Sequence, residues 1–386
     1  MGFRYRLHRN HQTNSYNGHI VTIALLVAGR GTRFNNHIPK CLMDVGGQSL
    51  LERTISLIRN NSKVIPILVI TGYMGEEVRK VAERLKDNNL TVIHNVKFEE
   101  DQNILSAQVA IKSSSKEILI LEGDCIFNEF SINEFISRMG VGENVFFTKD
   151  YALFTRENAI IKSNNEDFSG YLKGERGAEM EMDGWTNMAG AVLFNESAML
   201  KVSGFLENSK FKSNSTYYFQ PLLEDASLTS KVHLLSNNSM FITFNTQFEY
   251  LDSMAKIGVE TIISLFNVDL LNHVEGFSKK RVEWLKEKII TEGIWNLPIC
   301  IDGEYGIVMD GQHRMEVAKS LGLSNIPVLK FTHQEVEFWS LRDNHEVSLH
   351  QIIENHSTGN VYPYKTVKYG FPIEVPECSI SLEELR

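Results

Sequence analysis

The sequence predicts a two-domain chain whose first domain is α/β with a mostly parallel sheet. The length of 386 residues exceeds that of one ordinary domain. Short apolar runs typical of buried strands alternate with segments of helical periodicity as far as about residue 121. The character of the sequence changes after about Asp252, where a second unit of ordinary domain size begins. We therefore expect domains over residues 20–255 and 256–386, after a polar, basic and flexible leader over residues 1–19.

The strands of the first domain are apolar and rich in β-branched residues, and its helices carry apolar side chains at helical spacing. The predicted strands are residues 20–27, 64–71, 90–94, 117–121 and 187–194, and the predicted helices are residues 49–59 and 76–86. Residues 164–184 are glycine-rich and acidic, which predicts a loop over the site. Ligands bind beyond the carboxyl ends of parallel strands, so the residues that follow strands 20–27 and 117–121 should lie at the binding edge.

The second domain opens on an amphipathic helix over residues 278–292, with Ser278 as its N-cap. The apolar face expected for this helix consists of Val282, Leu285, Ile289 and Ile290. Further strands are predicted at residues 299–301, 306–309 and 326–331, with a helix over residues 315–321.

Charge and cysteine usage exclude several classes of protein. The net charge is −9 with a pI of about 5.8, and residues 256–386 carry 13 Lys and Arg against 19 Asp and Glu. Neither half is basic, so we expect no nucleic-acid partner. No run approaches the roughly 18 apolar residues of a membrane helix, which predicts no membrane partner.

The four cysteines are scattered, which argues against a disulfide framework or zinc site and suits a cytoplasmic location. Oligomeric state, a homo-oligomer included, is left open.

A phosphate cradle is predicted where the first strand ends. The turn Gly29–Arg33 offers consecutive backbone N–H groups, Arg33 adds a charged donor, and Lys40 follows as a compact cation. Asp124 follows a buried strand, where a carboxylate is costly unless it binds a cation such as Mg²⁺. This set suits attack on an α-phosphate with pyrophosphate leaving. The alternative is that the glycine turn is only a turn and that Asp124 is a loop or capping residue.

The string Leu26–Phe34, followed by Pro39–Leu42, resembles the signature of nucleotidyltransferases that activate sugar phosphates and choline phosphate. Val27 stands where the usual pattern has a second alanine. The resemblance implies a Rossmann-like, GT-A-like mixed sheet, contacts of Lys40 and Arg33 with the triphosphate, and Mg²⁺ on Asp124. The nucleotide loop that it implies consists of Ala28, Gly29, Gly31 and Thr32.

Later residues are similar to the phosphocholine and phosphonate cytidylyltransferase branch of that superfamily, which implies CTP as the nucleotide. They are Val92–Asn95, Asn103, Ser106 and Glu122–Asp124. In that branch Asn95, Asn103 and Ser106 are assigned to nucleotide or acceptor binding. The segment Asn245–Tyr250 resembles the closing segment that often supplies a second metal ligand. Asn245 stands where many relatives have Asp.

A second site is predicted around Asp310–Arg314, between a strand and a helix. Gly311 permits a tight turn, and the Arg314 guanidinium group can donate paired hydrogen bonds to a phosphate. The Asp310 carboxylate could hold Mg²⁺ or orient a hydroxyl group. Glu275 precedes a helix, where a carboxylate can accept the proton of an alcohol nucleophile. The alternative is that Asp310 caps its helix and Arg314 pairs with a surface acid.

The wider string, including Leu271–Glu275, Val308–Arg314 and Ile326–Val328, looks like a ParB-type α+β domain. Some members bind DNA and hydrolyse CTP, and others are free-serine kinases. Tyr362–Lys368 is similar to a segment of the serine-kinase branch. The resemblance implies ATP or ADP as phosphoryl donor and Glu275 as base. It assigns the phosphate and serine contacts to Asp310, Gly311, His313, Arg314, Trp339, Lys365 and Thr366. Gln312 stands where the family has His.

Together the two halves predict a bifunctional enzyme. One domain would phosphorylate L-serine, and the other would transfer CMP from CTP to O-phospho-L-serine, releasing pyrophosphate. One alternative is a cytidylyltransferase for another small phosphate or phosphonate with a regulatory or non-catalytic ParB-like domain. A second is a ParB-like, nucleotide-dependent DNA-binding regulator.

Overall fold

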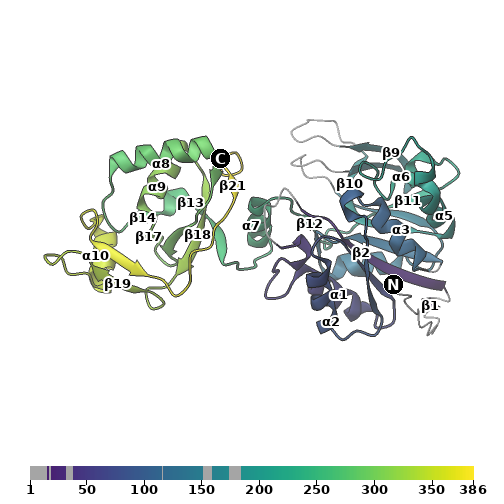
Figure 1. Cartoon of the computed structure of the whole chain (residues 1–386), viewed down its shortest axis with the longest axis horizontal. Helices are drawn as coiled ribbons and strands as arrows, with labels where there is room; N and C mark the ends of the chain where they lie inside the picture. The colour runs from purple at the N-terminus through teal and green to yellow at the C-terminus, as the bar shows by residue number, and fades with distance from the viewer. Residues whose placement is uncertain (1–14, 17–18, 32–37, 115, 151–158, 174–183) are drawn as a thin grey trace, which may run out of the picture. The chain divides into compact units, whose positions relative to one another are not determined.

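The computed structural model describes residues 15–16, 19–31, 38–114, 116–150, 159–173 and 184–386. The chain forms two compact units, the first reaching Thr243 and the second starting at Phe244 (Figure 1). Residues 244–255, which we predicted to belong to the first domain, therefore lie in the second unit. The two units are described separately.

The first unit is built on one mixed sheet with the strand order β4-β3-β2-β5-β10-β7-β11-β9-β8, and β1 pairs with β2. Its strands are β1 (Ser15–Tyr16), β2 (His19–Val27), β3 (Ile67–Thr71), β4 (Leu90–His94), β5 (Glu117–Glu122), β7 (Asn144–Lys149), β8 (Ala159–Asn164), β9 (Asp167–Lys173), β10 (Trp185–Phe194) and β11 (Ser230–Leu234). Strands β2 to β5 run parallel to one another, and β10 enters antiparallel beside β5. A small separate ladder joins β6 (Cys125–Phe127) and β12 (Phe241–Thr243).

The order of the parallel strands contains a reversal. The chain moves from β2 outward to β3 and β4, then returns to place β5 on the other side of β2. In open α/β sheets a crevice forms at such a reversal, beyond the carboxyl ends of the two strands. The residues after β2 and after β5 therefore lie at the place where this fold binds ligands.

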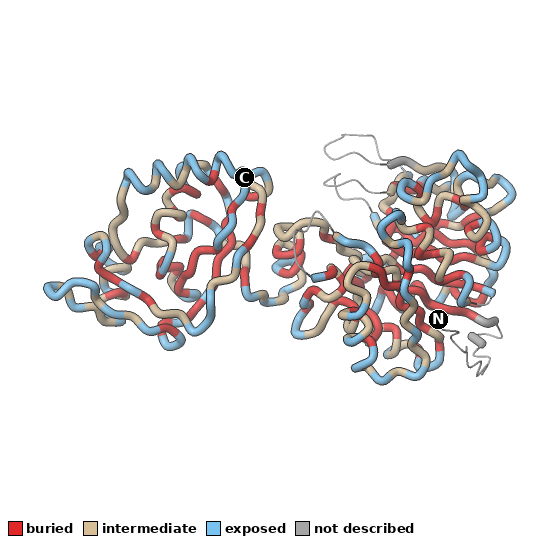
Figure 2. Tube along the Cα trace, viewed as in Figure 1, coloured by how far each residue is buried: buried red, intermediate tan, exposed pale blue. Residues whose placement is uncertain are grey.

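Helices cover both faces of this sheet. One core contains Leu51 and Ile55 of α1 (Leu50–Asn61), Val78 of α2 (Gly75–Arg84) and Phe135 of α4 (Glu129–Ser137). The opposite core is formed with α3 (Ile104–Lys112), α5 (Glu196–Gly204) and α6 (Gln220–Glu224). Because both faces are covered, the central strands are buried along their length, as the red segments of Figure 2 show.

Local signals account for most of these elements. Ser49 and Glu52 form a capping box that fixes the start of α1, and β4 occupies the predicted residues. The predicted loop over residues 164–184 is wrong over its first part, because β8 and β9 form an antiparallel hairpin there. Asn165 and Glu166 adopt positive φ at its turn. Residues 174–183 lie outside the described residues.

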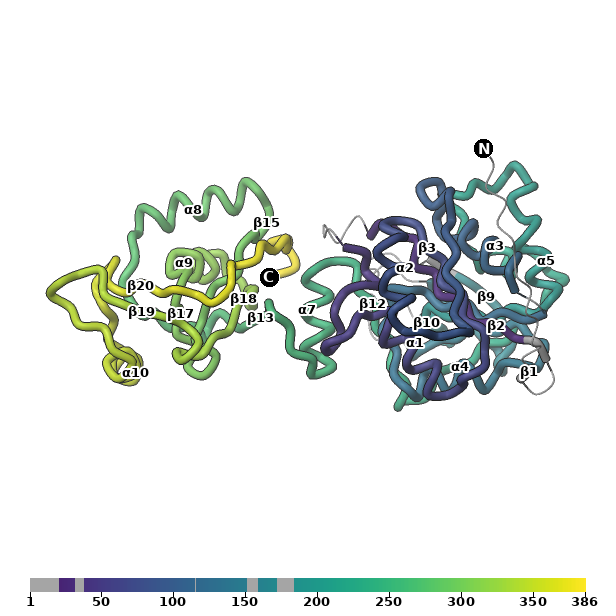
Figure 3. Tube along the Cα trace, turned by 60° about the horizontal axis from the view of Figure 1, so that its bottom comes forward, coloured from purple at the N-terminus to yellow at the C-terminus, as the bar shows by residue number. Residues whose placement is uncertain are grey.

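The second unit contains a mixed sheet with the order β13-β18-β16-β17-β14, together with the short pairs β15–β21 and β19–β20. Its strands are β13 (Ile263–Asn267), β14 (Asn272–His273), β15 (Ile294–Trp295), β16 (Ile299–Asp302), β17 (Ile307–Asp310), β18 (Asn325–Phe331), β19 (Glu337–Ser340), β20 (Val367–Gly370) and β21 (Ile380–Ser381). Its helices are α7 (Gln247–Lys256), α8 (Lys279–Glu292), α9 (Gln312–Leu321) and α10 (Leu349–Thr358). Helix α8 packs beside α9 (Figure 3).

Two predictions for α8 have different outcomes. Ser278 is its N-cap and accepts a hydrogen bond from the backbone N–H of Arg281, as predicted. Of the expected apolar face, only Ile289 is buried, and Ile290 is 51% exposed. Within the described residues, no helix is long and apolar enough to cross a bilayer.

Candidate functional site

The first site lies at the carboxyl edge of β2 and β5. Strand β2 ends at the turn Ala28–Gly31, and the 3-10 helix η2 (Lys40–Leu42) brings Lys40 against that turn. Gly31 has φ +58°, and a Cβ there would lie 3.2 Å from Lys40 Cγ. The positive φ favours glycine, and a Cβ would require the Lys40 side chain to shift by a few tenths of an ångström.

Gly123 places Asp124 beside the end of β2. Its backbone N–H donates to Leu26 O at 3.0 Å. A Cβ at this position would lie 2.3 Å from Val27 Cγ1 and 2.7 Å from Leu26 O, so only glycine fits. The chain can therefore turn tightly after β5, and Asp124 emerges at the sheet reversal.

Lys40 and Asp124 form the ion pair at the centre of this site, with Nζ and Oδ2 3.2 Å apart. The Lys40 side chain is 12% exposed and that of Asp124 is 36% exposed. A mostly buried cation next to a half-buried carboxylate suits the binding of an anionic ligand. Such a ligand would replace the Asp124 carboxylate as the partner of the Lys40 ammonium group. The sequence predicted these two residues as partners in one site, and the structure brings them together.

Glu122 is a third charged group at this edge that we did not predict. Burial and, second, the charge of Asp124 raise the pKa of Glu122 to about 7, against the opposing effects of Tyr218 and Lys40. A carboxyl group with so high a pKa next to another carboxylate is typical of functional sites. Its position two residues before Asp124, at the end of the same buried strand, was the available sequence signal.

These carboxylates belong to a candidate metal-binding group. One ligand atom each of Glu122, Asp124 and Cys125 lies within 4.8 Å of the others. Carboxylate oxygens are the ligands that Mg²⁺ prefers, so Asp124 and Glu122 fit a hard divalent ion. Such an ion would neutralise phosphate charge when bound. Cys125 does not belong to that chemistry, because thiolates select softer metals.

The predicted nucleotide or acceptor residues Asn95 and Ser106 lie together in a buried network around Asp101. Asn95 Nδ2 donates to Ser106 Oγ at 3.0 Å and to Asp101 Oδ2 at 3.1 Å. Burial raises the pKa of Asp101, against the hydrogen bonds that lower it. Asn103 Oδ1 accepts the backbone N–H of Tyr218 at 2.9 Å. These contacts hold the segments around the site, and direct binding by the three residues stays a prediction.

Three predicted residues are not part of this described geometry. Thr32 and Arg33 lie outside the described residues. Asn245, the predicted second metal ligand, belongs to the second unit, where its backbone N–H donates to the Glu249 carboxylate.

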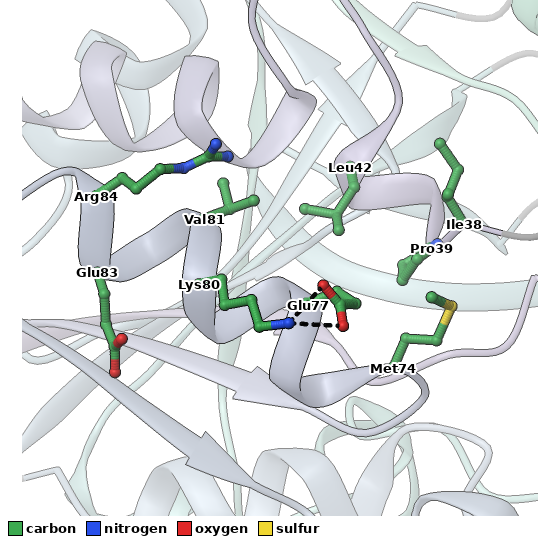
Figure 4. A pocket seen from close by; sticks show the side chains of 9 residues that line it. All are labelled: Ile38, Pro39, Leu42, Met74, Glu77, Lys80, Val81, Glu83 and Arg84. Carbon is green, nitrogen blue, oxygen red and sulfur yellow. Dashed lines mark hydrogen bonds and ion pairs between the residues drawn. The ribbon is translucent and has the colours of Figure 1, made fainter.

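A groove of ≈ 820 Å³ lies near the same loop but does not contain the ion pair (Figure 4). Apolar side chains and an exposed Lys80–Glu77 pair line it. Its lining residues are Ile38, Pro39, Leu42, Met74, Glu77, Lys80, Val81, Glu83 and Arg84. Neither Lys40 nor Asp124 belongs to this lining, so the groove is not the predicted phosphate site.

In the second unit, Glu275 is fixed by the backbone of the tail segment. Its Oε2 accepts the N–H groups of Thr366 at 2.7 Å and Val367 at 2.9 Å. Lys365 adopts φ +60°, which turns the chain so that these two N–H groups converge. The Thr366 side chain is buried, and its Oγ1 donates to Pro363 O. The structure thus joins two motifs that are 91 residues apart.

His313 lies next to this segment. Its Nε2 accepts the backbone N–H of Ser278 at 3.2 Å, and its ring contacts Tyr364 edge-on at 5.6 Å between centroids. Burial, and then the charge of Arg281, lower the pKa of His313. Glu275, His313 and Lys365 therefore belong to one neighbourhood, linked through residues 364–366.

Asp310 and Arg314 pair with each other. Arg314 Nη2 donates to Asp310 Oδ2 at 2.6 Å, and Nη1 donates to Pro298 O at 2.6 Å. Gly311, with φ +105°, is the N-cap of α9, so Asp310 does not cap the helix. Trp339 is 44% exposed on β19, and its serine contact stays a prediction.

The family model that matches this chain covers part of the first unit. Residues 23–155 match the family model of the MobA-like NTP transferase domain. A bifunctional protein GlmU of Rippkaea orientalis is 34% identical over 109 residues, which are 28% of this chain and 22% of that protein. The 2-C-methyl-D-erythritol 4-phosphate cytidylyltransferase of Thermosipho melanesiensis is 28% identical over 127 residues, 33% of this chain and 53% of that enzyme.

Among solved structures, the CTP:phosphocholine cytidylyltransferase LicC from Streptococcus pneumoniae is 16% identical, with a TM-score of 0.49. The alignment covers 61% of this chain and 99% of LicC. The chain spans only about a fifth of the GlmU relative and about half of the Thermosipho enzyme. Residues 23–155 of the first unit are thus similar to the MobA-like NTP transferase domain, and the unit has a Rossmann-like α/β fold.

Proposed function

We propose that this chain is a bifunctional enzyme that makes an activated, CDP-linked serine. The second unit phosphorylates free L-serine to O-phospho-L-serine. The first unit transfers CMP from CTP to that phosphate and releases pyrophosphate.

The observation that carries the nucleotidyl transfer is the Lys40–Asp124 pair at the reversal between β2 and β5. An oxygen of the acceptor phosphate attacks the α-phosphorus of CTP, and the bond to the pyrophosphate oxygen breaks. Lys40 stabilises the negative charge that develops on the leaving group. The acceptor is already an anion, so the reaction needs no general base.

The choice of CTP rests on two features. The residues Val92–Asn95 and Glu122–Asp124 are similar to the phosphocholine and phosphonate branch. The Thermosipho relative, by its name, is also a cytidylyltransferase that acts on a small phosphate. Both features favour a phosphorylated small molecule as acceptor.

The arrangement of Glu275 supports the kinase half. Two backbone N–H groups hold Oε2, which orients the carboxylate, and within the described residues no hydrogen bond to Oε1 is found. Oε1 is then suited to accept the proton of a serine hydroxyl as it attacks a terminal phosphate. His313 and Lys365 in the same neighbourhood supply groups that can contact phosphate.

One observation favours a second candidate, in which the ParB-like unit does not catalyse. The Arg314 guanidinium is held by Asp310 and by Pro298 O, and its side chain is only 15% exposed. Because these contacts occupy its guanidinium N–H groups, this arginine does not offer a pair of donors to a phosphate. In that case the first unit would activate a phosphate or phosphonate made by another enzyme.

Incubation of the full chain with L-serine, ATP, CTP and Mg²⁺, followed by ³¹P NMR and mass spectrometry, separates the two candidates. A product containing both serine and CMP, together with pyrophosphate, supports the bifunctional enzyme. A parallel reaction uses O-phospho-L-serine and CTP without ATP. Product only in this second reaction supports the second candidate, whereas product in neither contradicts phosphoserine as acceptor. Replacing ATP with ADP identifies the phosphoryl donor.

A further inference from the structure

The turn that binds Glu275 is itself held on its other side by the segment that follows β19. Glu275 Oε2 accepts the backbone N–H groups of Thr366 and Val367 at 2.7 and 2.9 Å. Each N–H belongs to a peptide group whose carbonyl oxygen is on the preceding residue, Lys365 or Thr366. Both of these carbonyl oxygens accept hydrogen bonds from residues 341–342.

Arg342 provides the charged donor to this turn. Its Nη2 donates to Tyr364 O at 2.7 Å, and its Nε donates to Lys365 O at 3.4 Å. The backbone N–H of Leu341 donates to Thr366 O at 2.8 Å. Exposed arginines usually contribute little, but a planar guanidinium group that binds two neighbouring carbonyl oxygens fixes the orientation of both peptide groups.

The hydrogen bonds through these peptide groups form two short chains that end on Glu275. In the first, Arg342 Nε donates to the Lys365 carbonyl oxygen, and the N–H of the same peptide group donates to Glu275. In the second, the Leu341 N–H binds the Thr366 carbonyl oxygen in the same way. A donor at the carbonyl oxygen polarises a peptide group and strengthens its N–H as a donor. The positive charge of Arg342 therefore acts on the Glu275 carboxylate through a peptide group.

The turn needs such support because its backbone conformation is unfavourable. Lys365 adopts φ +60°, in the left-handed region that residues other than glycine rarely adopt. Arg342 is fixed in turn, because its backbone N–H donates to Ser340 Oγ at 3.1 Å and the Ser340 hydroxyl donates to Arg342 O at 2.8 Å. Ser340 lies opposite Val367 in the pairing of β19 with β20. The strand register thus places Arg342 next to the turn.

We propose that Arg342 is a positioning residue for the serine kinase reaction and acts by holding the turn that orients Glu275. The inference rests on the proposed function, because it assumes that Glu275 is the base. In the reaction the serine hydroxyl proton passes to Glu275 Oε1 as the serine oxygen bonds to the terminal phosphorus of the donor. The bond from that phosphorus to the nucleotide oxygen breaks, and the nucleotide leaves with its electron pair. Arg342 keeps Oε2 engaged, so that Oε1 is presented to the hydroxyl.

Amide hydrogen exchange of the full chain tests the role of Arg342 in the turn without any assay of activity. The N–H groups of Thr366 and Val367 should exchange slowly in the wild type, since both are hydrogen-bonded to a carboxylate and both residues are buried. Arg342→Gln should accelerate exchange at both positions by about 10-fold, because the turn opens locally more often without its charged donor. Exchange in β18 should stay as in the wild type.

Serine phosphorylation provides a separate measurement. Arg342→Gln should lower kcat by roughly 10- to 100-fold and change the KM values for serine and ATP by less than about 2-fold, because a misdirected base impairs proton transfer and not binding. A low, non-denaturing concentration of guanidinium ion should restore part of the activity of Arg342→Ala. A residue needed only for folding would show neither the split between kcat and KM nor this rescue.

The matched control is Lys286→Gln. Lys286 is a cation of the same unit that also donates to a backbone carbonyl oxygen, that of Ser320 at 3.3 Å. This variant should keep the wild-type kcat and the wild-type exchange rates at Thr366 and Val367.

Either of two results in a folded Arg342→Gln chain would overturn the proposal. One is exchange at Thr366 and Val367 that is no faster than in the wild type, and the other is an unchanged kcat. If the wild-type chain phosphorylates no serine, the proposed kinase function fails, whereas the exchange rates still decide whether Arg342 holds the turn.

Discussion

Lys40 and Asp124 are 84 residues apart in the chain and meet because each follows a feature that fixes its position. A Cβ at Gly31 would lie only 3.2 Å from Lys40 Cγ, and Asp124 follows the obligatory glycine at position 123. The Lys40 ammonium group is thus held where the sheet order reverses. At the scale of one residue, the reaction should depend on this lysine.

Lys40→Ala should lower the rate of pyrophosphate release from CTP by at least about 100-fold, because it removes the donor that stabilises the leaving group. Serine phosphorylation should remain, since the groups proposed for it lie in the other unit. Coupled pyrophosphate detection and a separate assay for phosphoserine measure the two effects. Lys80→Ala is the control, because Lys80 is an exposed lysine of the same unit paired with Glu77 at 3.0 Å. Equal loss in both variants would contradict a specific role for Lys40.

At the scale of elements, the junction between β2 and β5 depends on the absence of a side chain at position 123. We expect Gly123→Ala to destabilise the first unit by about 1–3 kcal/mol, because its Cβ would overlap Val27 Cγ1 and Leu26 O. Nucleotidyl transfer should fall as well, since Asp124 moves with the turn. Denaturant unfolding and the transfer assay test both effects.

Gly29→Ala is the control for stability, because nothing lies within 4 Å of the position of its Cβ. If Gly123→Ala were as stable as Gly29→Ala, the close packing of β2 against the β5 turn would be wrong.

The loop after β11 is tied to α4 by Glu134. Partial burial would raise the pKa of this carboxyl group, but hydrogen bonds from Ser236, Ser239 and His233 outweigh it and lower the pKa to about 2. Because the folded-state pKa lies below the usual 4.5, the stabilisation is present above about pH 4.5 and is lost as the pH falls toward 2.

Glu134→Gln should therefore be less stable than the wild type near neutral pH, by at most about 3 kcal/mol. The difference should shrink steadily below pH 4.5. Urea unfolding at several pH values measures it. A difference that is constant down to pH 2 would show that the loss reflects packing and not the charge of Glu134.

At the scale of the whole molecule, each unit has its own sheet and its own candidate chemistry. If the product of the second unit diffuses to the first, two defective chains should complement each other. A mixture of Lys40→Ala and Glu275→Gln chains should form the CDP-linked product from serine, ATP and CTP, although neither variant does so alone. Added O-phospho-L-serine should rescue Glu275→Gln but not Lys40→Ala. Failure of the mixture, with each variant retaining its other activity, would contradict a freely exchanging intermediate.

The sequence predicted the elements whose signals are local. Strand β4 and the cap of α8 at Ser278 follow from apolar runs and capping chemistry close in the chain. The prediction failed at residues 164–173, where glycine and acidic residues indicated a loop but β8 and β9 pair. Pairing with neighbouring strands of the sheet outweighs a weak local preference.

The sequence alone determined the motif around Lys40, the carboxylate at Asp124 and the presence of a second unit with Glu275 and His313. Only the tertiary structure decided that Glu122, Cys125 and Tyr218 gather around Asp124, and that Arg314 is held by Asp310 and Pro298 O. The physical reason is that a motif records residues adjacent in the chain. Burial, the pKa of Glu122 and the partners of a guanidinium depend on segments that only the folded sheet brings together.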